Sequence, residues 1–100
     1  MTYGNQHYLA KRQLKAQLSR HADMRAQQRG IDQNSVRLVL AYGEREFDGH
    51  GGQRYLMTEK AMASLRRAVG KTPQVEALAG VYAVVSTEDP TVITLGHRFA

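Results

Sequence analysis

The sequence predicts an α+β domain in which N-terminal helices pack on one face of a small antiparallel sheet of about four strands. Apolar residues recur at helical spacing up to Gly43, and the period changes to two directly afterwards. Two alternating segments, 44–48 and 53–57, flank the sequence GHGG and are typical of a β-hairpin. The continuous apolar run VYAVVS, residues 81–86, is typical of a strand at the centre of a sheet.

The first 43 residues predict the helices that precede the sheet. Segment 8–28 contains neither glycine nor proline, so it forms one long helix or two helices that meet near Ser19, which is a suitable N-cap. Gly30 can adopt the left-handed conformation that closes a helix. Asp32 then caps a further helix that stops at Gly43. The positions of this helix that face the core are Val36, Val39 and Leu40.

The second half of the chain predicts one more helix, a short helical turn and a closing hairpin. Thr58 caps the helix and Gly70 ends it. Thr72 followed by Pro73 repeats the start signal, with proline at the first helical position. After the strand at 81–86, the segment 91–95 returns beside it, which completes the order ααββαββ. The expected buried positions of the helix are Met62, Leu65 and Val69.

Length and composition indicate one soluble domain. The chain has 100 residues, of which 42% are hydrophobic, and no cysteine, which excludes disulfides and thiolate metal sites. We divide it into a basic helical extension, residues 1–18, and a single α+β domain, residues 19–100. The first residues lack the features of a signal peptide, and no apolar run is long enough to cross a bilayer. We therefore expect a cytoplasmic protein.

The positive charge of the chain is concentrated in its N-terminal part. The formal net charge is +5, and residues 31–100 contain equal numbers of basic and acidic side chains. Concentrated positive charge attracts polyanions, so we expect RNA or an acidic protein as the partner. The alternative is an ordinary solvated helix face. The charged residues of segment 1–30 are Lys11, Arg12, Lys15, Arg20, Arg25 and Arg29 against Asp23.

The segment HADMRAQQRGI carries a stripe of basic residues. His21, Arg25 and Arg29 stand four apart, so a helix would stack them along one face. Like charges at this spacing cost a helix about 0.2–0.5 kcal/mol per pair. Phosphate binding would offset that repulsion, because arginine forks match phosphate oxygens. The alternative is that Arg25 or Arg29 pairs with an acid elsewhere, such as Glu44 or Glu46.

A second candidate group lies at the end of the last predicted strand, in the sequence GHR. His97 is a titratable group and Arg98 is a neighbouring cation. RNA cleavage without a metal needs a base, an acid and cations that stabilise the phosphorane. His21 and His97 are the candidate proton carriers. The candidate phosphate-binding residues are Arg25, Arg29, Arg98, Arg20 and Lys15. The alternative for His97 is a loosely ordered C-terminal tail.

Other chemistry has weaker support in the sequence. Glu44, Glu46, Asp48 and His50 alternate and could hold a divalent cation, but alternating charges are also typical of an edge strand. We therefore expect no metal site. Tyr55 can stack on a base or donate a proton, and more often such a residue packs on its sheet neighbour. The motifs of nucleotide cofactors and of serine or thiol catalysis are absent from the sequence, so we expect no cofactor.

The string S-x-H-A-x-x-R-x-x-x-R-G-I-x-x-x-x-V-x-x-V-L-x-x-G, residues 19–43, resembles a family of small uncharacterised bacterial and phage proteins. In that family a charged hairpin and a closing V-x-T strand follow, and here EREFDGHGGQRYLM and VITLGHR correspond to them. The resemblance covers roughly residues 19–97. Such proteins look like distant relatives of the barnase and RelE-like ribonuclease toxins, whose helices pack on a four-stranded antiparallel sheet.

The resemblance implies an RNA-directed role. His21, Arg25 and Arg29 fall on the helical motif of the family, and His97 falls near the closing strand, where the wider group often places a catalytic side chain. Two candidate functions follow, one enzymatic and one limited to binding. The favoured one is a toxin-like, metal-independent endoribonuclease, neutralised by an antitoxin or another acidic protein. The alternative is a non-enzymatic module that binds nucleic acid or an acidic protein, as phage accessory and regulatory proteins do.

Overall fold

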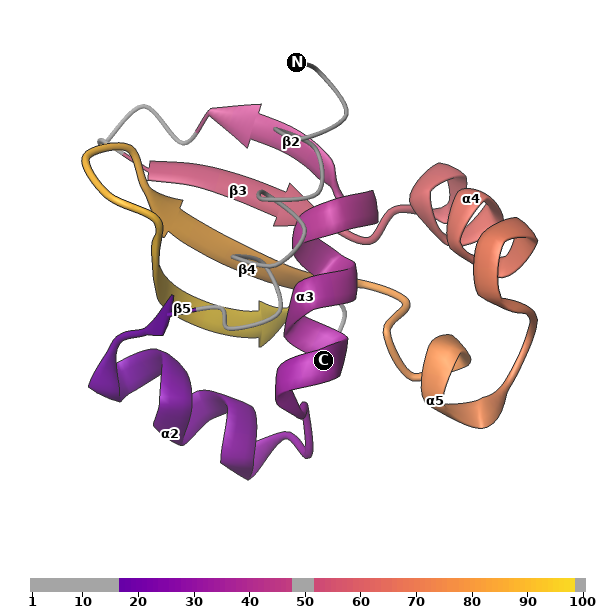
Figure 1. Ribbon diagram of the computed structural model, residues 1–100, viewed down its shortest axis with the longest axis horizontal. Helices are drawn as coiled ribbons and strands as arrows, with labels where there is room; N and C mark the ends of the chain where they lie inside the picture. Colours follow the sequence, from indigo (N-terminus) through magenta and orange to yellow (C-terminus); the bar gives the residue numbers. More distant parts are fainter. Residues whose placement is uncertain (1–16, 48–51, 99–100) are drawn as a thin grey trace, which may run out of the picture.

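The computed structural model describes residues 17–47 and 52–98, which form an α+β domain (Figure 1). Its sheet has the order β1-β5-β4-β3-β2. Strands β2 to β5 pair antiparallel, and β1 pairs parallel with β5. The elements in chain order are β1 (Gln17–Leu18), α2 (Arg20–Gln28), α3 (Gln33–Tyr42), β2 (Glu44–Phe47), β3 (Gly52–Leu56), α4 (Glu59–Val69), α5 (Pro73–Glu76), β4 (Val81–Ser86) and β5 (Thr91–His97).

Four helices begin at residues that the sequence marks as N-caps. The side chains of Ser19, Asp32, Thr58 and Thr72 each accept a hydrogen bond from the backbone N–H three residues ahead. These bonds satisfy N–H groups that have no partner inside the helix. The predicted helix starts are therefore confirmed. The four bonds measure 3.0, 2.7, 3.1 and 3.2 Å in chain order.

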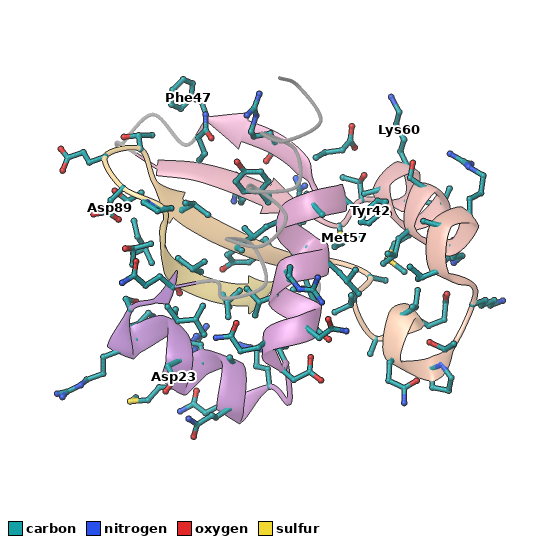
Figure 2. All side chains as sticks on the ribbon, viewed as in Figure 1. Asp23, Tyr42, Phe47, Met57, Lys60 and Asp89 are labelled. Atoms are coloured by element: carbon teal, nitrogen blue, oxygen red, sulfur yellow. The ribbon has the colours of Figure 1, made fainter. Side chains whose placement is uncertain are left out.

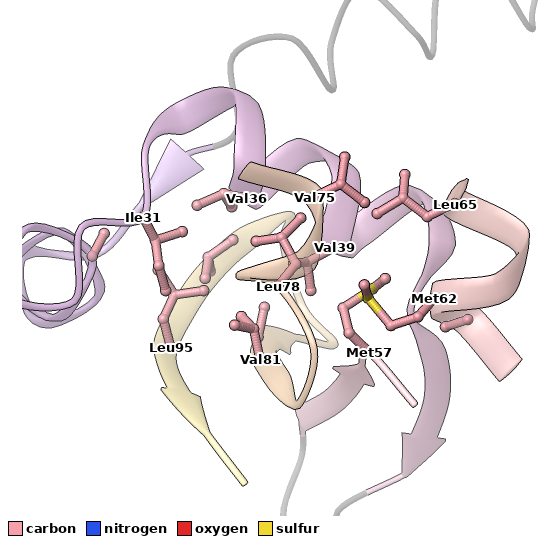
Figure 3. Packing of buried hydrophobic residues seen from close by; sticks show 14 of the residues in the cluster. Ile31, Val36, Val39, Met57, Met62, Leu65, Val75, Leu78, Val81 and Leu95 are labelled. Atoms are coloured by element: carbon pink, nitrogen blue, oxygen red, sulfur yellow. The ribbon is translucent and has the colours of Figure 1, made fainter. Parts of the chain in front are cut away.

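The hydrophobic core lies between the sheet and the helices. Helix α3 packs on β3 and β4, α4 packs on α3, and α5 packs on α4. Helix α2 lies along β5 instead, at the margin of the sheet (Figure 1). Figure 3 shows how the buried side chains of these elements meet, among them Ile31, Val36, Val39, Met57, Met62, Leu65, Val75, Leu78, Val81 and Leu95.

The structure corrects three expectations about the elements. The sheet has five strands in the described residues, because Gln17 and Leu18 form β1 and pair with Thr91 and Val92 of β5. These two residues had been expected in a helical extension. Val69, expected to be buried, is 49% exposed. The last strand continues past its predicted end, as far as His97.

The hairpin is confirmed as two antiparallel strands, β2 and β3. The β2 strand is exposed along its whole length, and Phe47 at its end is 75% exposed and projects away from the sheet (Figure 2). Asp48 and the first three residues of GHGG, which include His50, lie outside the described residues, and Gly52 is the first residue of β3.

Candidate functional site

Helix α2 is fastened to the free edge of β5 by its own side chains. The backbone N–H of Ser19 donates to the carbonyl of Val92 at 2.9 Å, and the Ser19 hydroxyl donates to the carbonyl of Ile93 at 2.8 Å. Two turns later, Arg25 Nε donates to the carbonyl of Leu95 at 3.4 Å. Val92 is still paired with Leu18 of β1, and the carbonyls of Ile93 and Leu95 face α2 beyond the end of β1. Ser19 and Arg25 therefore hold the helix on the sheet edge and satisfy exposed backbone acceptors.

Helix α2 ends in a glycine turn that places Arg29 at a corner of the fold. Gly30 has a φ of +65°, and the N–H of Ile31 reaches back to the carbonyl of Ala26 at 2.8 Å. This six-residue closure is a Schellman-type helix end, and it needs the left-handed conformation that glycine adopts most readily. Asp32 follows at once and caps α3. The predicted role of Gly30 is confirmed, and the turn presents Arg29 beside the start of α3.

The end of β5 brings His97 to the same corner. His97 pairs with the buried Val81 of β4, which places its side chain on the face of the sheet that the helices cover. It lines a cavity of about 310 Å³ together with Arg29. Residues far apart in the sequence are thus brought together by the packing of α2 along β5. The other lining residues are Gly30, Ile31, Asp32, Ser35, Pro73, Gln74, Ala77 and Leu78.

An ion pair holds the α5 wall of this cavity. Arg66 of α4 donates two hydrogen bonds to Glu76 of α5, one from Nε to Oε2 and one from Nη2 to Oε1, both at 2.8 Å. Two parallel N–H···O bonds fix orientation as well as distance. The hydrogen bond from Arg66 lowers the pKa of Glu76, so this carboxyl group stays ionised well into the acidic range. The Arg66–Glu76 pair therefore positions the segment that carries Pro73 and Gln74.

Three ionisable side chains line the cavity. Arg29 contributes a permanent positive charge, and His97 contributes an imidazole ring. Asp32 supplies a carboxylate whose pKa is lowered, first of all by the hydrogen bond from the backbone N–H of Ser35. Asp32 is therefore negative at neutral pH. In the described part of the chain, the cavity therefore brings together a guanidinium group, a carboxylate, an imidazole ring and the hydroxyl of Ser35.

His21 does not join this cavity. It lies exposed in the first turn of α2, whereas Arg29 follows its last turn. Eight residues of helix rise separate the two by about 12 Å along the axis. The predicted stripe exists on α2, but its three members have different surroundings: His21 at the exposed start, Arg25 on the edge of β5 and Arg29 at the cavity. Arg20 is the exposed first residue of the helix.

Arg98 lies apart from His97 although it follows it directly. It lines a second cavity of about 260 Å³, together with Glu59 and Met62 of α4, Leu56 of β3 and the loop segments 57–58 and 79–80. Its N–H donates to the carbonyl of Gly80 at 2.8 Å. Successive residues of an extended chain project to opposite sides, so neighbouring positions serve different cavities.

The remaining predicted site residues have structural surroundings or lie outside the described residues. Tyr55 packs partly buried against the core, as its alternative reading expected, and donates to Gln53 Oε1 at 3.3 Å. Lys15 lies outside the described residues.

The acidic residues of the hairpin have partners other than the α2 arginines. Glu46 lies 3.2 Å from Arg54 Nε, and Glu44 accepts from the Thr58 hydroxyl at 2.5 Å. Among residues 17–47 and 52–98, no cluster of three or more histidine or acidic side chains could hold a metal ion.

Sequence reasoning missed several polar groups. Ser35 and Gln74 line the cavity, and Asp32 was expected only as a helix cap. On the opposite face of the sheet, Arg54 lies over the ring of Tyr82, 5.9 Å from its centroid. The alternation of β3 and β4 could have placed Arg54 and Tyr82 on one face. No comparable signal in the sequence places Gln74 near His97, because that contact depends on how α5 packs.

These features define an α+β domain with a small mixed sheet and a polar cavity at the junction of α2, α3, α5 and β5. The chain belongs to a family described as a domain of unknown function, DUF4258, whose model matches residues 18–97. The matched segment begins in β1 and ends at His97, so it includes strands β2 to β5 and both His21 and His97. No curated protein and no solved structure matches the chain significantly. No helix in the described part of the chain is long and apolar enough to span a membrane.

Proposed function

We propose that this protein is an RNA-directed, toxin-like domain, and specifically a metal-independent endoribonuclease that works in the cavity at the ends of α2 and β5. The observation that supports it most strongly is that Arg29 and His97 line one cavity. A guanidinium group that holds a phosphate and an imidazole that moves a proton are the two groups this chemistry needs most. The resemblance to barnase and RelE-like toxins points to the same substrate.

In the proposed reaction, His97 accepts the proton of a ribose 2′-hydroxyl. The 2′-oxygen then bonds to the adjacent phosphorus, and the bond from phosphorus to the 5′-oxygen breaks. Arg29 stabilises the extra negative charge that the phosphorane carries. The leaving 5′-oxygen takes a proton from water, and His97 returns its own proton to solvent. The products are a 2′,3′-cyclic phosphate and a 5′-hydroxyl.

This scheme uses one histidine where the sequence suggested two. His21 lies about two helical turns from Arg29 and is not among the residues that line the cavity. We therefore assign His21, with Arg20, to the exposed basic surface of α2, where it would contact the RNA backbone outside the reacting phosphate. Arg25 keeps its fastening role on β5, with its Nε committed to the Leu95 carbonyl.

The test is induced expression with growth and total RNA followed together, and then cleavage by the purified protein in the presence of a metal chelator. We expect growth arrest and RNA fragments with 2′,3′-cyclic phosphate ends. His97→Ala should abolish both, whereas the matched variant His21→Ala should retain cleavage. Thermal unfolding of each variant verifies the fold. Cleavage by a folded His97→Ala protein, or cleavage that stops when metal is chelated, would contradict the proposal.

The second candidate is a binding module without catalysis, for RNA or for an acidic protein. The separation of the two histidines favours it, because only one proton carrier lines the cavity. Intact RNA and normal growth in the experiment above, with RNA binding that still depends on Arg29, would establish this reading.

If the protein is a toxin, a neutralising protein should cover the basic surface of α2 with an acidic surface. Such a complex should weaken markedly between about 50 and 200 mM salt, because charge attraction between exposed groups is screened over that range. An affinity that does not change with salt would contradict this partner chemistry.

A further inference from the structure

We infer that the cavity at the ends of α2 and β5 is a single-nucleotide site, which binds one ribonucleoside monophosphate unit and excludes nucleoside triphosphates. The inference rests on the proposed function and goes further, because it names the unit of substrate that the cavity holds and the residues that contact each part of it.

The size of the cavity limits its occupant to one small group. Its volume is about 310 Å³. Small-molecule sites in proteins span about 300–1,000 Å³, so this one lies at the lower end of that range. A single nucleotide fits such a space, whereas a longer stretch of RNA must leave the cavity on either side. The exposed basic face of α2, which begins at Arg20, offers the continuing backbone a path.

The lining of the cavity separates into an apolar floor and a polar rim. Ile31 and Leu78 are 8% and 3% exposed, so they form the deep part. The flat face of a nucleobase is apolar and suits such a floor. Arg29 and Asp32 are exposed and His97 is partly buried, so the polar groups surround the entrance. A ligand with an apolar ring at one end and charged oxygens at the other matches this division.

The charges at the rim select a monophosphate. Among the lining residues that the structure describes, Arg29 supplies the permanent positive charge, and Asp32 brings a carboxylate to the same rim. One phosphate can sit against Arg29 and His97 and stay clear of Asp32. Three linked phosphates carry about four negative charges, which the one arginine and one carboxylate that the described residues bring to this rim do not neutralise. Free triphosphates should therefore bind much more weakly than monophosphates.

Asp32 also supplies an acceptor for ribose. One of its oxygens accepts from the backbone N–H of Ser35 at 2.7 Å, which fixes the carboxylate at the start of α3. A carboxylate held in place is a good acceptor for a sugar hydroxyl, and acidic residues perform this task in dinucleotide sites. Binding should favour ribonucleotides over 2′-deoxynucleotides, because only ribonucleotides carry the 2′-hydroxyl whose proton His97 accepts in the proposed reaction, and Asp32 is then the acceptor for the other sugar hydroxyl.

The experiment titrates the full chain with 3′-nucleoside monophosphates and follows backbone amide shifts by NMR. The comparison ligands are inorganic phosphate, an uncharged nucleoside, the 2′-deoxy monophosphates and ATP. We expect at least one monophosphate to shift the amides of Gly30, Ser35 and Leu78 at concentrations at which phosphate, nucleoside and ATP have little effect. Equal shifts with inorganic phosphate alone would overturn the inference, because the cavity would then bind any anion.

Two variants with matched controls test the assignment. Arg29→Ala should weaken monophosphate binding at least tenfold, whereas Gln28→Ala, the neighbouring exposed residue outside the cavity, should not. Ala77→Phe should fill the cavity from its exposed wall and block binding, whereas Ala41→Phe on the exposed side of α3 should not. Unchanged binding in Arg29→Ala or in Ala77→Phe would overturn the inference.

The failures of the two proposals are distinguishable. Monophosphate binding in this cavity without RNA cleavage would leave the nucleotide site standing and refute the nuclease. RNA cleavage that depends on His97, without any binding of monophosphates, would support the nuclease and refute the single-nucleotide site.

Discussion

Two arginines of one motif, Arg25 in the last turn of helix α2 and Arg29 directly after it, have different surroundings. Arg25 is half-buried and donates to the Leu95 carbonyl, so it belongs to the joint between helix and sheet. Arg29, one turn later, is exposed and lines the cavity with His97. The same residue type at helical spacing therefore joins the helix to the sheet at one position and lines the cavity, where we propose that it binds the ligand, at the next. Identical chemistry in a motif does not imply identical function.

The stripe of basic residues on α2 raises the question of why a helix tolerates neighbouring like charges. Arg25 offers a structural answer, because a carbonyl acceptor on β5 holds its guanidinium group. Arg29 offers a functional one, because a phosphate would neutralise it. The helix start carries a balancing acid, Asp23, whose carboxylate accepts from Gln27 at 3.2 Å and which lies on the outer side of α2 (Figure 2).

The largest expected effect on stability comes from the start of α2. Ser19→Ala removes both the helix cap and the hydroxyl that donates to the Ile93 carbonyl. We expect a loss of about 1–2 kcal/mol in the free energy of unfolding. In a domain of this size each kcal/mol lowers the melting temperature by about 4–8 °C. Circular dichroism during heating measures it, and Ser19→Thr is the control that keeps both bonds. An unchanged melting temperature in Ser19→Ala would show that α2 does not depend on this joint.

The second-largest effect on stability is expected at Gly30, in the turn that ends α2. Gly30→Ala meets no atom within 4 Å, so any cost is conformational. A residue with a Cβ pays about 1 kcal/mol at this positive φ. Asn tolerates the conformation better, and Gly30→Asn should therefore lose less. Urea unfolding compares the two variants. A Gly30→Ala protein as stable as the wild type would mean that the helix end can close in another way.

A smaller effect is expected at Arg25. Arg25→Ala leaves the Leu95 carbonyl to solvent and removes the packing of the arginine stem on β5. We expect a loss of about 0.5–1 kcal/mol, because the bond is long and only partly buried. Chemical unfolding measures it, and Gln28→Ala is the exposed control on the same helix. A stability equal to that of the control would remove Arg25 from the joint.

The smallest effect is a dependence on pH at the start of α3. Folding lowers the pKa of Asp32, mainly through the Ser35 N–H. The resulting stability is present above the pKa of an unfolded aspartate and is lost as the pH falls through the lower folded value. Because Asp32 is exposed, solvent keeps the effect below about 1 kcal/mol. Asp32→Asn should lose less stability than the wild type between pH 5 and pH 3 in urea unfolding. Parallel losses in the two proteins would assign the acid sensitivity to other carboxyls.

Much of the fold could be predicted from the sequence because residues close together in the chain determine where its helices start. Helix starts at Ser19, Asp32, Thr58 and Thr72 depend on a side chain and an N–H three residues away, so the cap residue alone predicts them. The pairing of Gln17 with Thr91 depends on segments 74 residues apart, and two residues are too few to show a period. The prediction that Val69 is buried was wrong because helical spacing does not show where the packed part of a helix ends. It stands at the last position of α4, beyond the side chains that α4 buries.

The sequence predicted which residue types form the candidate site, but it did not predict which of those residues line the same cavity. Arg29 and His97 were chosen for their chemistry, but only the path of α2 along β5 brings them to one cavity. His21 shares the stripe with Arg29, yet three residues at successive turns span more length than one phosphate needs. Gln74 arrives on a short helix that the Arg66–Glu76 pair holds in place, which no local pattern reveals.

The most direct test of this account measures stability and RNA affinity side by side in Arg25→Ala and Arg29→Ala. Melting temperatures and the binding of a short RNA, followed by fluorescence anisotropy at a temperature where both proteins are folded, supply the two quantities. The account predicts that Arg25→Ala melts earlier and binds RNA normally, and that Arg29→Ala melts normally and binds about tenfold more weakly. Equal losses of RNA affinity in both variants, or normal binding by Arg29→Ala, would contradict it.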